Sequence, residues 1–197
     1  MALQDRVKRI LLSPKEEWPV IDAEQTSVAA LYTGYIIPLA AIGPIASIIG
    51  WTVFGMQVPF VGSYRLPIGF AVRNAALQYV GTLVGVFVLA LIIDGLAPTF
   101  GGQKNQIQAL KVSAYSATAA WVAGIFGLIP SLGFLGLLGL YSLYLLFLGL
   151  PILMKAPEDK AMGYTLVVIV VAIVLGFLVS ALTARLMWHP AMGVPGM

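Results

Sequence analysis

The chain has 197 residues, of which 60% are apolar and only 10% are charged, and its formal net charge is +3. Soluble domains carry about 25% charged residues, so this chain has too few charges to cover the surface of a water-soluble fold. The composition predicts an integral membrane protein folded as one helical bundle, and the absence of a basic stripe interleaved with aromatic residues excludes nucleic acid as a partner.

Residues 1–27 form a more polar segment that we expect on the cytoplasmic side. The first twelve place apolar side chains at helical spacing with basic side chains between them, namely Leu3, Val7, Ile10 and Leu11 with Arg6, Lys8 and Arg9. This pattern predicts a short amphipathic helix, which either lies on an anionic membrane surface or packs on the protein's own cytoplasmic loops. Trp18 follows, at a position typical of an indole in the lipid headgroup region.

Five apolar spans come next, each near the roughly 20 residues that cross a hydrocarbon core of about 30 Å. We expect them at residues 28–54, 70–97, 106–129, 132–154 and 162–187. The predicted fold is therefore all-α, a five-helix transmembrane bundle over residues 28–188 followed by a C-terminal tail at 189–197.

The first span contains Pro38 and Pro44, and each proline removes a backbone donor and frees a carbonyl that a neighbour must satisfy. The pattern indicates either an ordinary proline kink or a broken helix that lines a cavity, as in many transporters. In both cases we expect this span to depart from a straight helix.

The third span presents small side chains along one face, at spacings of three and four residues: Ala109, Ser113, Ala117, Ala120, Gly124 and Gly127. Such a face lets helices pack closely within a membrane, so we expect this helix in the middle of the bundle. The second span carries a weaker form of the same pattern, with Gly81 and Gly85 one turn apart.

Lysine and arginine are unevenly divided between the two sides of the predicted bundle. Eight of the eleven flank one side, namely Arg6, Lys8, Arg9, Lys15, Lys104, Lys111, Lys155 and Lys160, whereas Arg65, Arg73 and Arg185 flank the other. Because basic residues concentrate on the cytoplasmic side of membrane proteins, we expect a cytoplasmic N-terminus and an external C-terminus. Anionic headgroups of the bilayer are the expected partners of the cytoplasmic side.

The connection from Asp94 to Lys111 is the longest polar interruption between two strongly apolar spans. Asp94 lies near the cytoplasmic end of the second span, where the helix dipole disfavours a negative charge. It either forms an interfacial ion pair with Lys104 or Lys111, or serves as an ion or proton relay, since acids inside a membrane are costly and usually functional.

A second polar cluster, Arg73, Asn74 and Gln78, lies on the first turns of the second span, and Asn74 and Gln78 share a face. The cluster is either a cap at the level of the headgroups, with Arg73 reaching lipid phosphates, or a ligand site. The sequence does not separate these two readings.

The sequence lacks the groups that intramembrane catalysis needs. It has no cysteine, its only histidine is His189 in the tail, and Asp94 has no second membrane acid beside it. The usual zinc ligands and the His-Glu-x-x-His, Gly-x-Ser-x-Gly and Walker sequences are absent. We therefore expect no enzyme activity, no metal and no cofactor.

Five stretches carry a further signal: SPKEEWPVI, LYTGY, LAPTFGGQKNQIQALKVSAYS, GLIPSLGFLGLLGLYSLYL and KAPEDKAMGY. The most specific part is Phe100-Gly101-Gly102 with the Gln108-Ala109-Leu110 and Ala114-Tyr115 that follow. Together with the last, valine-rich span, the chain resembles over nearly its whole length the Yip-domain family of Ypt-interacting proteins, and most closely its bacterial branch. The family often has a proline shortly after this tyrosine, where this chain has Ala117-Thr118-Ala119-Ala120.

The resemblance implies five transmembrane helices, a cytoplasmic N-terminus and an exposed C-terminus. It links the eukaryotic relatives to Rab-type GTPases, vesicle trafficking and membrane shaping. Those relatives use a longer N-terminal cytoplasmic region than the roughly 27 residues found here, so we do not transfer the GTPase role to this chain.

We expect a non-enzymatic protein of the bacterial inner membrane that organises the membrane or recruits partners, either as a homo-oligomer or with another membrane protein. The recruiting surface would combine the amphipathic N-terminus with the Asp94–Lys111 and Lys155–Lys160 connections. The alternative is a small transporter, channel or lipid-handling protein that uses the broken first span and Asp94.

Overall fold

The computed structural model describes residues 2–58 and 62–187; the predicted tail at 189–197 and residue 188 lie outside the described residues. Nearly all of the described chain is helical, and η marks its π-helical and 3-10 segments. In chain order the elements are α1 (Leu3–Leu12), α2 (Pro14–Ala23), α3 (Val28–Leu31), η1 (Tyr32–Ile36), α4 (Ile37–Ala40), α5 (Ile42–Ile49), η2 (Gly50–Phe54), β1 (Met56–Val58), β2 (Gly62–Tyr64), α6 (Ile68–Leu96), η3 (Ala97–Phe100), α7 (Gln106–Ser116), α8 (Thr118–Ala123), η4 (Gly124–Leu128), η5 (Pro130–Leu140), α9 (Tyr141–Met154) and α10 (Glu158–Met187).

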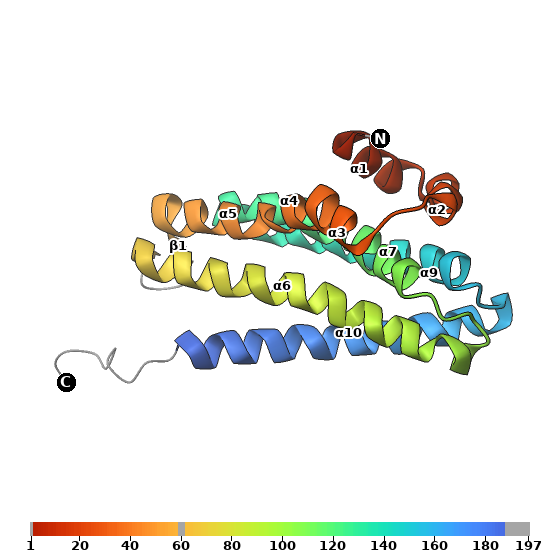
Figure 1. Ribbon diagram of the computed structural model, residues 1–197. Helices are drawn as coiled ribbons and strands as arrows, with labels where there is room; N and C mark the ends of the chain where they lie inside the picture. Colours follow the sequence, from red (N-terminus) through yellow and green to blue (C-terminus); the bar gives the residue numbers. More distant parts are fainter. Residues whose placement is uncertain (1, 59–61, 188–197) are drawn as a thin grey trace.

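The long helical segments lie side by side and run lengthwise through one bundle (Figure 1). α6 packs against α7 and α10, and α7 packs against α9 as well. α1 and α2 lie on one flank, towards the end at which α6 leads into α7 and α9 leads into α10, which we call the near end (Figure 1). The antiparallel β1–β2 hairpin and the last turns of α10 lie at the opposite, far end (Figure 1).

Among the described residues, four helical stretches are long and apolar enough to cross a membrane: Val28–Phe54, Ile68–Phe100, Pro130–Met154 and Glu158–Leu186. These stretches make the chain an integral membrane protein by length and composition. The third predicted span, 106–129, is not among the four, so the predicted count of five is not met by this criterion. Its residues instead form α7, α8 and η4, with a break at Ala117.

α7 can be polar because the helices around it shield it from lipid. Its residues from Ala109 to Ser116 are all buried, and they include Lys111 and Ser113. The hydroxyl of Ser113 donates to the Val86 carbonyl of α6 at 2.9 Å. Because α7 packs against both α6 and α9, the central position predicted from the small-residue face is confirmed for this helix.

The break between α7 and α8 contains no proline. Two hydroxyl groups that donate to backbone carbonyls account for it. The Ser116 hydroxyl donates to the Val112 carbonyl, and the Thr118 hydroxyl donates to the Tyr115 carbonyl at 2.6 Å. Bonds of this kind compete with the helical ladder and bend helices. The interruption at Ala117 therefore arises without the proline that relatives often carry nearby.

The first span departs from a regular α-helix just before each of its two prolines. The π-helical η1 precedes Pro38, and a turn at Ala41 precedes Pro44. The hydroxyl of Tyr79, on α6, donates to the Ile37 carbonyl at 3.0 Å. A neighbouring helix thus supplies a donor to the interrupted backbone, as the apolar interior of a membrane requires.

Candidate functional site

Arg6 is the centre of a buried polar cluster that holds α1 and α2 to the bundle. Its guanidinium forms salt bridges with Glu17 of α2 and with Glu24 just beyond that helix. It also lies over the ring of Tyr115 in α7, 5.6 Å from the ring centroid. Arg6 is 5% exposed and Glu17 is 3% exposed, so the pair is removed from water. Breaking a buried pair leaves an uncompensated charge and is strongly destabilising. The cluster therefore fixes α1 and α2 to the bundle.

Tyr115 extends the cluster into the interior of the bundle. Its ring is tilted against that of Tyr35 in η1, with the centroids 4.5 Å apart. The hydroxyl oxygen of Tyr35 lies 2.7 Å from that of Thr118 in α8. Because Thr118 uses its own proton on the Tyr115 carbonyl, Tyr35 is the donor in this bond. The cation–π contact, the aromatic pair and the hydrogen bond thus connect α1, the first span, α7 and α8.

Lys111, on α7, caps the end of α2. Its ammonium donates to the Ile21 carbonyl at 2.8 Å and also to the Glu24 carbonyl. The last carbonyls of a helix have no donor within the helix, and the dipole at this end favours a cation. The predicted ion pair between Lys111 and Asp94 is therefore wrong, because Lys111 is turned towards the N-terminal helices.

Asp22 connects α2 to the bundle through hydrogen bonds and through a salt bridge. Its backbone carbonyl and its Oδ1 each accept from the Gln108 side-chain amide at 3.0 Å. Its carboxylate also forms a salt bridge with Lys155, in the connection between α9 and α10. These bonds fix α2 to two separate parts of the near end.

The side chain of Trp18, on α2, faces α9 and does not contact lipid headgroups. It is fully buried, as are Ile10 and Ile21. It packs on Gly149 of α9, where an added Cβ would overlap the indole ring. The apolar face of α1 and α2 therefore contacts the protein itself, with α2 against α9 and α1 against α8.

We refer to α1 and α2, fixed in this way, as the N-terminal hairpin. Three of its basic side chains, Lys8, Arg9 and Lys15, remain exposed. They are exposed together with the acidic Asp5 and Glu16, and we call the three basic side chains the basic face.

Phe100, Gly101 and Gly102 join the α6–α7 connection to the α9–α10 connection. Phe100 stacks on Tyr164 of α10, with the rings 4.9 Å apart and 6° from parallel. Gly101 has a φ of 74°, which favours glycine. At Gly102 an added Cβ would come within 2.7 Å of the Met154 carbonyl oxygen. The stretch with the most specific resemblance is thus a tightly packed junction, which we call the glycine junction.

Asp94 lies beside this junction, near the end of α6. The hydroxyl of Tyr164 donates to the carbonyl of Ile93, which precedes Asp94 in the chain. The Oδ1 of Asp94 is buried and accepts no hydrogen bond from the residues that the structure describes. The exposed Lys104 does not pair with it either, since none of the salt bridges found among the described residues joins Lys104 to Asp94.

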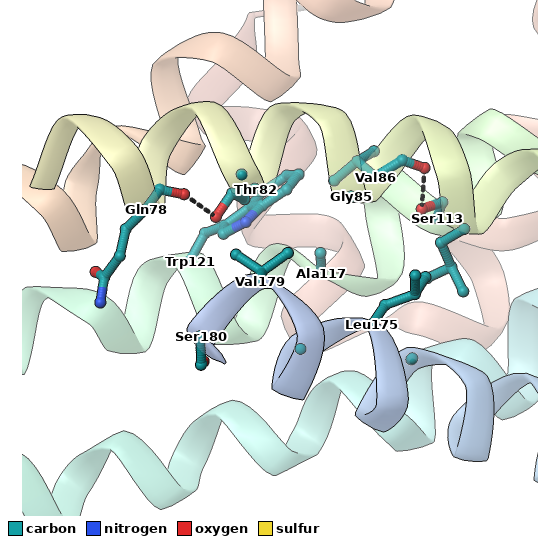
Figure 2. Close-up of a pocket in the computed structure, with 14 residues that line it drawn as sticks. Gln78, Thr82, Gly85, Val86, Ser113, Ala117, Trp121, Leu175, Val179 and Ser180 are labelled. Carbon is teal, nitrogen blue, oxygen red and sulfur yellow. Dashed lines mark hydrogen bonds between the residues drawn. The ribbon is translucent and has the colours of Figure 1, made fainter. Parts of the chain in front are cut away.

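Two cavities lie in the far half of the bundle. One, of about 900 Å³, is bounded by α5, α6, α8–η4 and η5, and Pro44 is part of its lining. The other, of about 360 Å³, is bounded by α6, α7–α8 and α10 (Figure 2). Pro38 is exposed and lines neither of these two cavities. Of the two readings of the prolines, the one in which a broken helix lines a cavity fits Pro44.

The predicted cluster of Arg73, Asn74 and Gln78 does not form one site. Gln78 lines both cavities, whereas Arg73 and Asn74 line neither of them. Arg73 is exposed and Asn74 is half-buried near the far end of α6. Gln78 therefore faces the cavities, whereas Arg73 and Asn74 lie nearer the far end of the helix.

Sequence reasoning did not predict the cluster around Arg6. Its carboxylate partners are 11 and 18 residues away along the chain, and Tyr115 belongs to a different span. A usable signal was present, because Glu17 directly precedes Trp18 in a helix whose apolar side has to be covered. A carboxylate that is buried beside a tryptophan needs a cation as its partner, because an unpaired buried charge is costly.

In a comparison with known families, the family model described as the Yip1 domain matches residues 8–180. This range contains Glu17, Glu24, the glycine junction and the lining of both cavities. Comparisons with curated proteins and with solved structures gave no match.

Proposed function

The chain belongs to the Yip1 domain family of membrane proteins, and we propose that it organises the membrane and recruits partners through its near end, without enzyme activity. The observation that carries this proposal is the docking of the N-terminal hairpin through Arg6. Because the hairpin is fixed, its basic face is a surface of defined shape. A cluster of basic side chains next to a bilayer attracts anionic headgroups.

We place the near end in the cytoplasm and the far end outside, in the bacterial inner membrane. Eight of the eleven lysines and arginines belong to segments at the near end, as the distribution of basic residues in membrane proteins requires. The fifth crossing in this proposal is residues 106–128; it is supported by α6 ending at the near end and η5 beginning towards the far end (Figure 1). This crossing is polar in α7, which the surrounding helices shield.

The partners that we propose are anionic lipid headgroups and a second membrane protein, which can be another copy of this chain. Lys104 and Lys160 are exposed and extend the basic surface beyond the N-terminal hairpin. The absence of enzyme activity is proposed from the sequence, which has no cysteine and one histidine.

The lipid part of the proposal is tested in nanodiscs of mixed phosphatidylglycerol and phosphatidylcholine. Native mass spectrometry gives the ratio of the two lipids that stay bound to the released protein. Replacing Lys8 and Lys15 with glutamine removes two charges from the basic face, and we expect the share of phosphatidylglycerol to fall.

The matched control removes two exposed charges from the far end, with Arg65→Gln and Arg185→Gln. We expect it to lower the phosphatidylglycerol share less than the near-end pair does. An equal or larger loss in the control would contradict the proposal, because the basic face would then have no special affinity.

A second candidate function is transport of a small solute, which Pro44 in the wall of a cavity and the unpaired Oδ1 of Asp94 favour. Flux across proteoliposomes separates this candidate from the first. Solute flux that is lost in Asp94→Asn would support transport. Flux equal to that of empty liposomes would reject it.

A further inference from the structure

The two cavities adjoin beside α6, because Gln78, Thr82 and Trp121 line both of them. We call the two together the intramembrane cleft; Figure 2 shows the smaller one. Their volumes of about 360 and 900 Å³ match the roughly 300–1,000 Å³ of small-molecule sites. The cleft goes beyond the proposed function, which uses the opposite end of the protein.

The walls of the cleft suit a linear hydrocarbon chain. Glycines and alanines of α6 and α10, together with Ala117 between α7 and α8, line part of the smaller cavity. A Cβ added at Gly85 or Gly176 would meet nothing within 4 Å, so the space beside them is open. At Gly81 an added Cβ would come within 2.6 Å of the Val179 side chain, which shows that α6 and α10 touch there. The result is a narrow slot between helices.

Gln78 is the polar group at the far-end mouth of the cleft. Its side chain is exposed and forms no hydrogen bond with the rest of the described chain. Figure 2 shows Gln78 and Ser180 at one end of the smaller cavity, and Ser113, bonded to the Val86 carbonyl, at the other end. An unpaired amide is costly in the interior of a membrane. This mouth therefore favours a ligand that brings an oxygen acceptor.

The length of the cleft matches one acyl chain. The lining of the smaller cavity on α6 runs from Gln78 to Leu89, which is about 16 Å at a rise of 1.5 Å per residue. One leaflet is half of a hydrocarbon core of about 30 Å. A chain that begins with an ester group at Gln78 would therefore extend past Ser113 to the end of the cleft at Leu89.

We propose that the intramembrane cleft binds a diacyl glycerophospholipid of the leaflet at the far end. One acyl chain lies in the cleft, and the side-chain amide of Gln78 donates to the ester carbonyl of that chain. The side chains at the edge of the cleft face lipid, since Phe134 and Leu137 are 64% and 68% exposed. A second copy of this chain would have to supply an acceptor at this depth, whereas every diacyl lipid carries an ester there.

The first test uses a phosphatidylcholine with a diazirine in one acyl chain, in nanodiscs that contain the protein. After irradiation, mass spectrometry of peptides is expected to find adducts on Thr82, Trp121 and Val179, which line the cleft. Gly85→Leu places a side chain in open space within the cleft and should abolish these adducts. Gly95→Leu also enters open space, outside the cleft, and should keep them. Adducts that persist in Gly85→Leu at the level of the parent would overturn the proposal.

The second test asks whether the ester carbonyl is recognised, and it begins with the unaltered protein. An unlabelled diester lipid should compete for photolabelling better than its diether analogue, by about twofold to tenfold, the effect of one hydrogen bond. Gln78→Leu should remove this preference. Equal competition by the two lipids in the parent would overturn the proposal. Adducts between two copies of the protein at the cleft, with no lipid adducts, would overturn it as well.

Discussion

The guanidinium of Arg6 lies 5.6 Å from the centroid of the Tyr115 ring, which joins the first helix of the chain to the central helix of the bundle. The carboxylates of Glu17 and Glu24 hold the same guanidinium. The N-terminal hairpin is therefore part of the protein core. Because the hairpin is packed into the core, its basic face keeps its shape when it contacts lipid or a partner.

Arg6→Ala should lower the free energy of unfolding by about 3–5 kcal/mol, because it leaves a buried carboxylate without its cation. The Arg6 and Glu17 side chains are 6% and 4% exposed. Glu24→Gln should cost less, because the Glu24 side chain is 39% exposed and water screens its charge. Denaturant unfolding in detergent measures both changes. Arg9→Ala, at an exposed neighbour, is the control and should change little; equal effects at Arg6 and Arg9 would contradict the account.

Gly149→Ala should loosen the N-terminal hairpin, because the new methyl group overlaps the Trp18 indole. Overpacking of this kind costs about 1–3 kcal/mol. Limited trypsin digestion should then cut faster at Lys15, in the first turn of α2. Gly95→Ala adds a methyl group where nothing lies within 4 Å, and it should leave the rate of cutting unchanged.

Much of the general architecture could be predicted from the sequence. Composition alone identified a membrane protein, and the small side chains from Ala109 onwards placed α7 in the middle of the bundle. The break at Ala117 was not predicted, because it depends on the Ser116 and Thr118 hydroxyls bonding to backbone carbonyls. Such bonds form only once neighbouring helices have excluded competing partners.

The candidate site was harder to predict, because periodicity shows that a face is buried without showing what covers it. Trp18 was assigned to the headgroups, yet Gly149 provides a space for its ring in another helix. Lys111 was one of two lysines, with Lys104, considered as an ion-pair partner for Asp94. Its true partners, the carbonyls at the end of α2, are 90 and 87 residues away in sequence, and only the fold brings them together.

Gly102→Ala should destabilise the glycine junction, because the added Cβ would lie 2.7 Å from the Met154 carbonyl oxygen. The backbone amide of Gln103 donates to this same oxygen at 2.7 Å, so a shift of the chain also weakens a hydrogen bond. Thermal unfolding in detergent measures the effect. At Gly163 an added Cβ would make an ordinary contact of 3.6 Å with Phe100, so Gly163→Ala should be milder. If the two variants unfold at the same temperature, close packing at Gly102 is not important.

Lys111→Met should destabilise the protein by about 1–3 kcal/mol for each buried carbonyl that loses its donor. The carbonyls affected are those of Ile21 and Glu24. The methionine keeps much of the length of the side chain, so the loss reports mainly on the ammonium. Lys104→Met removes an exposed lysine and serves as the control in the same denaturant titration. Similar midpoints for the two variants would contradict the role of Lys111 as a helix cap.

The topology can be tested with single cysteines, because the chain has none of its own. Lys104→Cys should react with a membrane-impermeant maleimide from the cytoplasmic side only, and Arg65→Cys from the outside only. Labelling of intact cells and of inside-out vesicles distinguishes the two sides. Labelling of both positions from the same side would rule out a single crossing by α6 and, with it, the proposed orientation.

Hydrogen–deuterium exchange in lipid nanodiscs tests the central claim most directly, namely that the N-terminal hairpin is built into the bundle. The account predicts that backbone amides of α1 and α2 exchange slowly, approaching the rates of the buried helix α7, and that Arg6→Ala speeds exchange in both helices. Exchange of α1 and α2 at the rate of a free peptide in the unaltered protein would contradict the claim.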